Sequence, residues 1–285
     1  MATCKFVHTA SNRVTLISAG PLAPYMKGLH MKKHTIALTA LSVSMLAGSA
    51  MAQSAIKICH ENEDSYPWIF KDRVGLTTSL LKMAEKAYGG KVEVVGLPWK
   101  RCLDDARAGA VDGVVKISYA ADRTDFLVYP MAGATPDASK RLLNDSYSLY
   151  RMKGSTAATW DGKTLKVDGA IGAQSGFSIV KQLQSLGARV DDGTRSADAN
   201  LTKLVGGRLA AVALQTEEGD ISVAGSPETN GKVERVSPFL VEKPYFVAFS
   251  KQFYGKDEAS AKKLWDAIAT ARESTEYKDL VKKFK

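Results

Sequence analysis

The stretch from Gly113 to Arg123 carries residue types that suit the binding of a small anion. It begins with apolar, strand-forming residues, continues through the polar segment Lys116–Ser118, and reaches Arg123 among small and acidic neighbours. A guanidinium presents a planar pair of donors that matches the two oxygens of a carboxylate. We therefore predict that this stretch forms a pocket floor on which Arg123 holds a carboxylate. The alternative for Arg123 is a surface ion pair with Asp122 or Asp125.

A second candidate site for an anion lies at Gly176, Phe177 and Ser178, where a turn opens a helix. The free N–H groups of a helix start attract anions. An ordinary helix cap by Ser178 is the alternative, and it is compatible with binding. Trp99 offers an aromatic face for stacking on a ligand, or equally a core contact.

Signals of catalysis, metal binding or nucleic-acid binding do not stand out. The sequence has no G-x-S-x-G motif, no zinc-type Cys/His cluster and no basic stripe. His60 is the one histidine after residue 52, and we interpret it as structural. We predict neither a cofactor nor a metal, and no nucleic-acid partner.

The amino-terminal region has the features of an export signal. Residues 31–33 form a short positive segment, residues 36–47 are apolar, and Ala50-Met51-Ala52 fits the small-x-small cleavage rule. We expect residues 31–52 to be a signal peptide, Gln53 to be the mature N-terminus, and the mature protein to be secreted. Residues 1–30 are expected to be an extension upstream of the true start codon.

Charge and cysteine content are interpreted after this cleavage. Residues 1–52 contain five Lys and Arg and no acid, so the formal charge falls from +9 to +4, which demands no polyanionic partner. Cys59 and Cys102 remain, and in an oxidising compartment they form a candidate disulfide. Two buried free thiols are the alternative.

Strand and helix patterns alternate along the whole mature chain, which is typical of α/β domains with parallel sheets. In the first part we expect strands at 55–59, 91–95 and 111–115, and helices at 75–88 and 100–108. In the middle part we expect strands at 146–150, 170–173, 188–190, 209–214 and 233–236, with helices over 178–186 and 197–204. At the end we expect a strand at 244–249 and helices at 258–274 and 276–284. The chain is expected to cross between two lobes within 132–145 and again at 237–243.

The order of several short motifs resembles the periplasmic solute-binding proteins of ABC importers, of the polar amino-acid-binding type (bacterial extracellular solute-binding protein family 3). The motifs are Tyr66-Pro67-Trp68, 94–99, 109–115, Asp122-Arg123 with Phe126 and Tyr129-Pro130, 172–176, 245–250 and 277–284. The resemblance implies a periplasmic-binding-protein type II fold: two lobes, each a mostly parallel sheet flanked by helices, joined by a two-strand hinge. The first lobe would comprise residues 53–140 and 241–285, and the second lobe residues 141–240.

The resemblance also implies site residues. Arg123 falls on the carboxylate-binding arginine, Ser118 and Ser178 fall on ligand-contacting hydroxyls, and Trp99 falls on a position that lines the cleft. The further predicted contacts are Glu61, Tyr66, Gly176, Phe177, Lys116 and Gln215. Neighbouring first and second strands would bring Cys59 and Cys102 close together.

Two positions depart from the family pattern. Gln215 stands where amino-acid binders usually place an acid, and Lys116 stands where small or hydroxyl residues are common. These departures favour a keto acid, a dicarboxylate or another small organic anion, whereas a ligand with an amine would use Glu61 or Glu63.

The resemblance implies a monomeric binding component that delivers a small carboxylate-bearing solute to an ABC permease in the inner membrane, and that is not an enzyme. Two alternatives remain open. One is a secreted enzyme on the same fold, such as a dehydratase of prephenate-like acids, and the other is a periplasmic sensory module.

Overall fold

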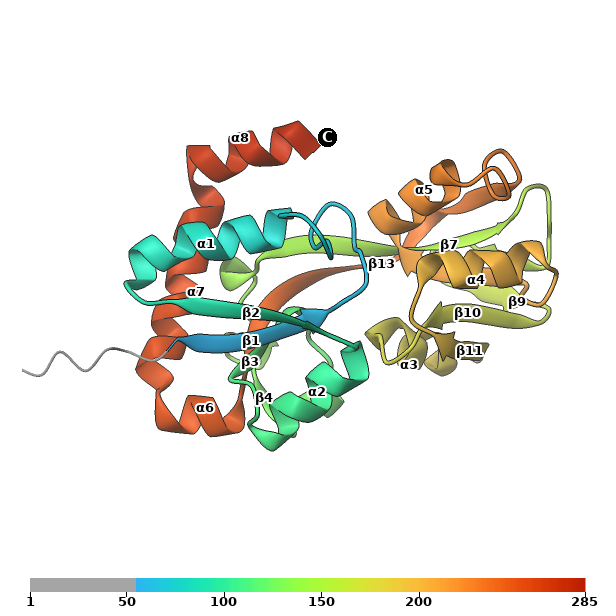
Figure 1. Ribbon diagram of the computed structural model, residues 1–285. Coiled ribbons are helices and arrows are strands. Elements are labelled where there is room, and N and C mark those ends of the chain that lie inside the picture. Colours follow the sequence, from blue (N-terminus) through green and yellow to red (C-terminus); the bar gives the residue numbers. More distant parts are fainter. Residues whose placement is uncertain (1–54, 285) are drawn as a thin grey trace, which may run out of the picture. The chain divides into compact units, whose positions relative to one another are not determined.

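The computed structural model describes residues 55–284 (Figure 1). The predicted extension and signal peptide therefore lie outside the described residues. No helix within residues 55–284 is both long and apolar enough to cross a membrane.

The first lobe is built on a parallel sheet in the order β3-β1-β2. Its elements are β1 (Ile56–Glu61), α1 (Leu76–Tyr88), β2 (Val92–Leu97), α2 (Trp99–Ala108) and β3 (Gly113–Ser118). Helix α1 buries a stripe of leucine side chains and ends at Gly89, whose φ of 77° favours glycine. All six residues of β3 are buried, and the strand continues three residues past Val115 to carry Lys116 and Ser118 into the interior. This strand was expected to begin at Val111 and to end at Val115.

Two long strands join the lobes: β7 (Leu143–Met152) and β13 (Val233–Ser250). They pair with each other in antiparallel register, β13 pairs with β3, and β7 pairs with β12 of the second lobe. Through them the main strands of the two lobes form one continuous sheet, in the order β11-β10-β12-β7-β13-β3-β1-β2. The prediction of two separate strands at 233–236 and 244–249 was wrong, because β13 runs through both. The register shifts between Val236 and Val241, around Pro238, which has no N–H to donate to the ladder.

The second lobe repeats the parallel pattern, with β10 between β11 and β12. Its main elements are β10 (Ala170–Gln174), α3 (Ser178–Ser185), β11 (Arg189–Thr194), α4 (Ala197–Val205), β12 (Ala211–Gln215) and α5 (Thr216–Gly225). Helix α5 was not predicted, because its sequence TEEGDISVAG has no apolar stripe of helical period. The helix expected over 178–186 ends at Ser185, and Leu186 follows it and is exposed.

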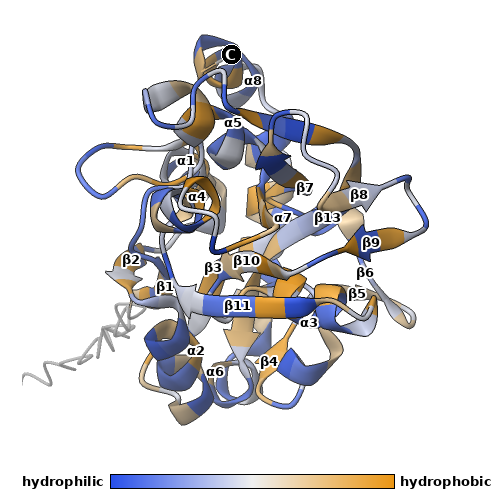
Figure 2. Cartoon of the chain, turned by 90° about the vertical axis from the view of Figure 1, so that its right-hand side faces the viewer, coloured by the Kyte–Doolittle hydropathy of each residue, from blue (hydrophilic) through white to orange (hydrophobic). Residues whose placement is uncertain are grey.

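The remaining described elements are short strands and carboxyl-terminal helices. They are β4 (Leu127–Val128), β5 (Met131–Ala132), β6 (Thr135–Pro136), β8 (Ala158–Trp160), β9 (Leu165–Val167), α6 (Lys251–Lys256), α7 (Glu258–Glu273) and α8 (Thr275–Phe284). Helix α7 packs against α1, and its Trp265 donates a hydrogen bond to the carbonyl of Val247 in β13 (2.7 Å). Figure 2 shows β10 as largely hydrophobic and α2 as largely hydrophilic, as expected for a buried strand and a surface helix.

Candidate ligand-binding site

A pocket lies between the two lobes, at the carboxyl ends of β1, β3, β10 and β12 and beside the hinge strands. The empty space among its lining residues, with the solvent at its mouth included, is about 490 Å³. Its lining comprises Glu61, Glu63, Asp64, Ser65, Ile69, Trp99, Val115, Lys116, Ser118, Arg123, Tyr147, Gln174, Phe177, Ser178, Gln215, Glu218 and Tyr245. Eight of the ten predicted contact residues are among them.

Arg123 lies in the pocket wall at the end of a 3-10 turn and is only 6% exposed. Its guanidinium donates to the carbonyl of Ser118 (2.9 Å) and, across to the second lobe, to the carbonyl of Gly176 (3.3 Å). Among residues 55–284 no carboxylate lies within 4.0 Å of it, and Asp122 pairs with Lys181 instead. Arg123 is therefore a buried cation without an anionic protein partner in the described chain.

Hydroxyl groups from the two lobes meet beside Arg123. Ser118 Oγ and Ser178 Oγ are 3.0 Å apart, and Ser178 is the first residue of α3. Lys243 of β13, which sequence reasoning missed, donates to Ser178 Oγ (3.3 Å). Burial, together with the nearby charge of Arg123, lowers the pKa of Lys243 to about 8. Lys243 thus contacts the Ser178 hydroxyl, close enough to Arg123 for the two cations to repel each other.

Trp99 connects the first lobe to the second at this end of the pocket. Its backbone N–H donates to Glu61 Oε2 (3.0 Å), and its indole N–H donates to the carbonyl of Gly176 (3.0 Å). The ring of Phe177 packs edge-on against it, with 5.8 Å between centroids. Gly176 itself does not line the pocket, but its carbonyl accepts from both Trp99 and Arg123.

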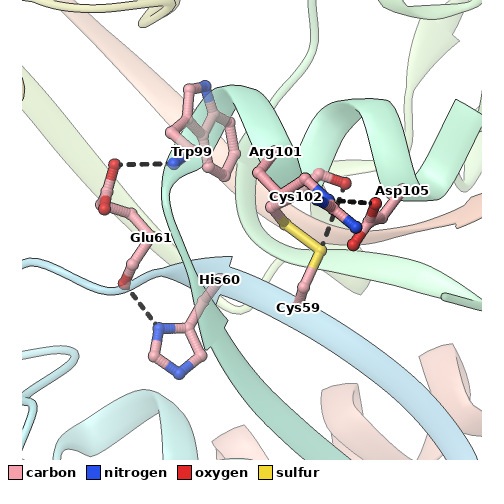
Figure 3. The surroundings of a disulfide bond; sticks show 7 residues. All are labelled: Cys59, His60, Glu61, Trp99, Arg101, Cys102 and Asp105. Atoms are coloured by element: carbon pink, nitrogen blue, oxygen red, sulfur yellow. Dashed lines mark hydrogen bonds and ion pairs between the residues drawn. A yellow bond between two sulfur atoms is a disulfide. The ribbon is translucent and has the colours of Figure 1, made fainter. Parts of the chain in front are cut away.

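The predicted disulfide between Cys59 and Cys102 is present and fixes the base of this arrangement (Figure 3). It joins β1 to α2, with both cysteines fully buried. Because Glu61 follows Cys59 on the strand and Trp99 begins the helix, the bond holds these two pocket residues in register. The sequence was right about the pair, although Cys102 lies within a helix.

Lys116 occupies a different corner, where every donor has a protein partner. Its ammonium donates to Ser65 Oγ (2.7 Å) and Gln215 Oε1 (2.6 Å), and it pairs with Asp145 Oδ2 (3.3 Å). The side chains of Lys116 and Asp145 are 6% and 4% exposed. Lys116 has a φ of 54°, the one positive φ of a non-glycine residue among those described. The expectation that its charge is available to a ligand anion is wrong, because Asp145, at a distant position in the sequence, neutralises it.

Gln215 belongs to the same corner and is also fully engaged. Besides Lys116, its Oε1 accepts from Ser65 (3.1 Å), and its Nε2 donates to the hydroxyl of Tyr245 (3.0 Å). Burial raises the pKa of Asp145, and the charge of Lys116 opposes that shift. This corner therefore links the first lobe, the hinge and the second lobe through contacts of the protein with itself.

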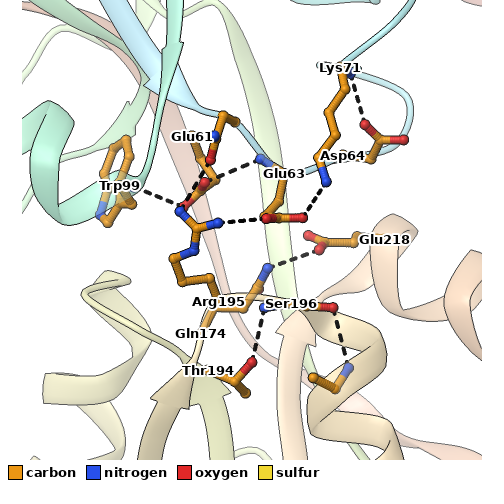
Figure 4. Close-up of polar contacts among 12 residues, drawn as sticks. Glu61, Glu63, Asp64, Lys71, Trp99, Gln174, Thr194, Arg195, Ser196 and Glu218 are labelled. Carbon is orange, nitrogen blue, oxygen red and sulfur yellow. Dashed lines mark hydrogen bonds and ion pairs between the residues drawn. The ribbon is translucent and has the colours of Figure 1, made fainter.

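Acidic side chains gather on the remaining wall (Figure 4). Glu63 forms ion pairs with Lys71 (2.7 Å) and with Arg195 of the second lobe (2.8 Å). Glu61 and Glu218 form no ion pair within residues 55–284, and burial raises the pKa of both, that of Glu218 to about 8. Sequence reasoning did not place Glu218 in the site, because helix α5 went unrecognised.

Tyr66 does not line the pocket, so its predicted ligand contact is not supported. Its hydroxyl donates to the carbonyl of Phe284 (2.5 Å), and its ring packs edge-on against Phe70 and Phe284. Helix α8 thus covers the side of the turn on which Tyr66 lies. His60 is buried outside the pocket lining, with Nδ1 2.6 Å from the carbonyl of Glu61, and burial lowers its pKa.

Comparisons with known proteins agree with this geometry at the level of the fold. No model of a known protein family matches the sequence, and no curated protein does. Among solved structures, a histidine kinase sensor domain with similarity to periplasmic binding proteins has a TM-score of 0.64 at 16% identity, covering 82% of this chain and 96% of its own. The substrate-binding protein of an amino-acid ABC transporter gives 0.63 at 17% identity, covering 81% and 99%. An arginine transport-system periplasmic binding protein from Legionella pneumophila gives 0.64 at 13% identity, covering 81% and 99%.

At these identities the likeness establishes the fold: the chain folds as a two-lobed periplasmic binding protein. By their descriptions, the three compared structures are one sensor domain and two substrate-binding proteins of transport systems.

Proposed function

We propose that the protein captures a small carboxylate-bearing solute between its lobes in the periplasm and delivers it to an ABC permease. In this proposal residues 53–140 and 241–285 form the first lobe, residues 141–240 form the second, and the protein acts as a monomer after loss of residues 31–52. The ligand carboxylate docks on Arg123, with Ser118 and Ser178 as hydroxyl contacts.

The observation that carries the proposal is the state of Arg123. A buried guanidinium is costly unless it is paired, and no carboxylate of the described chain pairs with it. A ligand carboxylate would supply the missing charge in a place with little water, where the attraction is strong. The neighbouring start of α3 adds N–H groups that favour an anion.

The contacts between lobes explain how binding would be coupled to closure. Arg123 and Trp99 both donate from the first lobe to the carbonyl of Gly176 on the second. Ser118 and Ser178 meet across the same junction. A carboxylate held at this junction contacts both lobes, so it stabilises the closed arrangement relative to an open one. A permease can distinguish the closed, ligand-bound form from the open form by its shape.

A sensory role is the second candidate, because one of the compared structures is a histidine kinase sensor domain on the same fold. The pocket would work in the same way, and the partner would be a signalling protein. Deleting the gene separates the two roles. Loss of uptake of the radiolabelled ligand indicates transport, whereas loss of a transcriptional response with normal uptake indicates sensing.

The binding proposal is tested by a thermal-shift screen of amino acids, keto acids and dicarboxylates, followed by titration calorimetry on the compounds that bind. Binding to the native state raises the melting temperature. We expect at least one carboxylate to stabilise the protein, and Arg123→Ala to weaken its affinity at least 100-fold. Arg189→Ala, on the exposed first residue of β11, is the matched control and should bind normally. Unchanged affinity of Arg123→Ala would refute the assignment.

A further inference from the structure

Gln174 and Glu218, both from the second lobe, line the same pocket as Arg123 and have no role in holding a carboxylate. Gln174 is the last residue of β10, and Glu218 lies in the first turn of α5. They are 2% and 6% exposed, so water does not readily satisfy their polar atoms. Figure 4 shows them reaching toward each other, below the acidic residues of the first lobe.

Their mutual hydrogen bond leaves two acceptors unused. Gln174 Nε2 donates to Glu218 Oε1 (2.9 Å), which fixes the orientation of the amide. The remaining oxygens, Gln174 Oε1 and Glu218 Oε2, have no hydrogen-bond partner among residues 55–284. Buried acceptors without a partner are rare in native proteins and call for a ligand or water. Here both orphans belong to one pair of side chains that lines one pocket.

The charges in the pocket indicate which kind of ligand group fits. Lys116 is neutralised by Asp145, and Glu63 is neutralised by Lys71 and Arg195. Within the described chain, Arg123 remains as a lining cation without an ion pair, and Glu61 and Glu218 remain as buried lining acids without one. An anionic group suits Arg123, whereas the two acids and the two orphan acceptors suit a positively charged hydrogen-bond donor.

We propose that Gln174 and Glu218 form a second subsite that binds a cationic nitrogen group of the ligand, with Glu61 adding negative charge from the facing lobe. This inference rests on the proposed function, and it names the ligand class: a small molecule with a carboxylate at one end and an ammonium, amidinium or guanidinium at the other. The cationic group donates to Gln174 Oε1 and Glu218 Oε2, and its positive charge favours the ionised form of Glu218 in the complex. Gln215 takes no part, because Lys116, Ser65 and Tyr245 use its polar atoms.

This ligand class reverses the preference for keto acids and dicarboxylates that Lys116 and Gln215 suggested in the sequence. A dicarboxylate would place its second carboxylate beside the oxygens of Gln174, Glu61 and Glu218, where the described chain offers no unpaired lining cation. A carboxylate without a nitrogen group would leave the two acceptors unsatisfied, and that penalty gives discrimination.

The test compares ligands that differ only at the second group. The pairs are 5-aminovalerate with valerate, 4-guanidinobutyrate with butyrate, and lysine with norleucine, with glutarate and adipate as dicarboxylates. Affinities are measured by titration calorimetry on the wild type, on Glu218→Gln and on Gln174→Leu. Glu93→Gln, on an exposed position of β2, makes the same chemical change away from the pocket.

We expect the cationic member of at least one pair to bind at least 10-fold more tightly than its partner and than either dicarboxylate. Glu218→Gln keeps the shape of the side chain and should reduce that ratio about 10-fold, with Glu93→Gln unchanged. Gln174→Leu should reduce it as well, and melting curves verify that each variant is folded. Equal affinity within every pair, or a ratio that survives both variants, overturns the subsite and leaves carboxylate capture by Arg123 intact. Failure of every carboxylate to bind the wild type overturns both proposals.

Discussion

Lys116 and Arg123 are seven residues apart on the same stretch, both buried and both lining the same pocket, yet their surroundings differ completely. Lys116 has three oxygen partners, one of them the carboxylate of Asp145. Arg123 has two backbone carbonyls and no carboxylate within residues 55–284. Sequence alone assigns both residues to anion binding, and only the structure separates them.

The difference shows that the partners of a buried charge decide whether it is available to a ligand. A cation whose donors are filled by the protein contributes to stability and to the arrangement of the lobes, and it offers nothing to an anion. A cation whose protein partners are uncharged groups, such as backbone carbonyls, can still bind an anion. We therefore expect substitutions at Lys116 to act on folding, and substitutions at Arg123 to act on binding.

The largest effect is expected for Lys116→Met. Removing the ammonium leaves Asp145 as a buried carboxylate without a counter-ion, which costs about 3–5 kcal/mol of unfolding free energy. Chemical denaturation of the variant measures this loss, with Lys57→Met on β1 as an exposed control. The double variant Lys116→Met/Asp145→Asn should recover part of the loss. A loss of unfolding free energy below 1 kcal/mol for Lys116→Met would show that Lys116, like Arg123, contributes little to folding through its charge.

The disulfide is expected to have the next largest effect, and it supports the Arg123 end of the pocket. Replacing Cys59 and Cys102 by alanine releases a constraint on a loop of 43 residues, which costs about 2–4 kcal/mol. Because the bond also sets Trp99 against Glu61, ligand affinity should fall along with stability. Lys116→Met should lose less ligand affinity than the disulfide variant for the same loss of unfolding free energy. Paired denaturation and calorimetry on both variants make the comparison.

Much of the fold was predictable because its signals are local. Apolar runs of strand length, helical stripes and glycine at helix ends located β1, α1, β2 and α2 in order. The same local signals placed Arg123 and Ser178 after buried strands, where an α/β sheet presents its pocket. Helix α5 carries no such stripe and contains Gly219, so no local pattern revealed it.

What the sequence could not show are pairings set by the order of strands. Asp145 lies on β7 and Lys116 on β3. These strands lie on either side of β13 in the sheet, and this order brings the two side chains within contact distance. The family resemblance assigned Tyr66 to the pocket, but its ring and hydroxyl contact Phe284 of helix α8, more than 200 residues later. The partners of a polar side chain decide its role, and here those partners come from distant segments.

A moderate effect is expected from the pH, through Glu218 on the acidic wall of the pocket. Burial raises its pKa from an ordinary 4.5 to about 8, with Asp145 and Asp198 adding to the shift while Lys116 and the hydrogen bond from Gln174 oppose it. The folded protein therefore binds an extra proton between these two values, so its stability falls as the pH rises through this range. The contribution from Glu218 amounts to about 2 kcal/mol between pH 6 and pH 8.

Glu218→Gln should remove that contribution, so its stability curve is flatter than that of the wild type across pH 6–8. Glu61 and His60 titrate in both proteins and cancel in the difference. Denaturation at several pH values measures the two curves. Parallel curves would mean that Glu218 is ionised in the folded protein at neutral pH. Its charge would then be stabilised within the protein, as the charge of Lys116 is by Asp145.

The smallest effect is expected where a contact between the lobes is open to solvent. Arg195 pairs with Glu63 at 2.8 Å and donates to Asn62, but its side chain is 37% exposed. Such pairs contribute about 0–1 kcal/mol and weaken with salt. Arg195→Ala should therefore reduce ligand affinity no more than about five-fold at low salt, and the difference should shrink as salt is added. Arg123→Ala should instead lose most affinity at every salt concentration, because its charge is buried. Calorimetry of both variants at two salt concentrations makes the test: an equally salt-sensitive loss in both would show that burial does not shield the charge of Arg123 from salt.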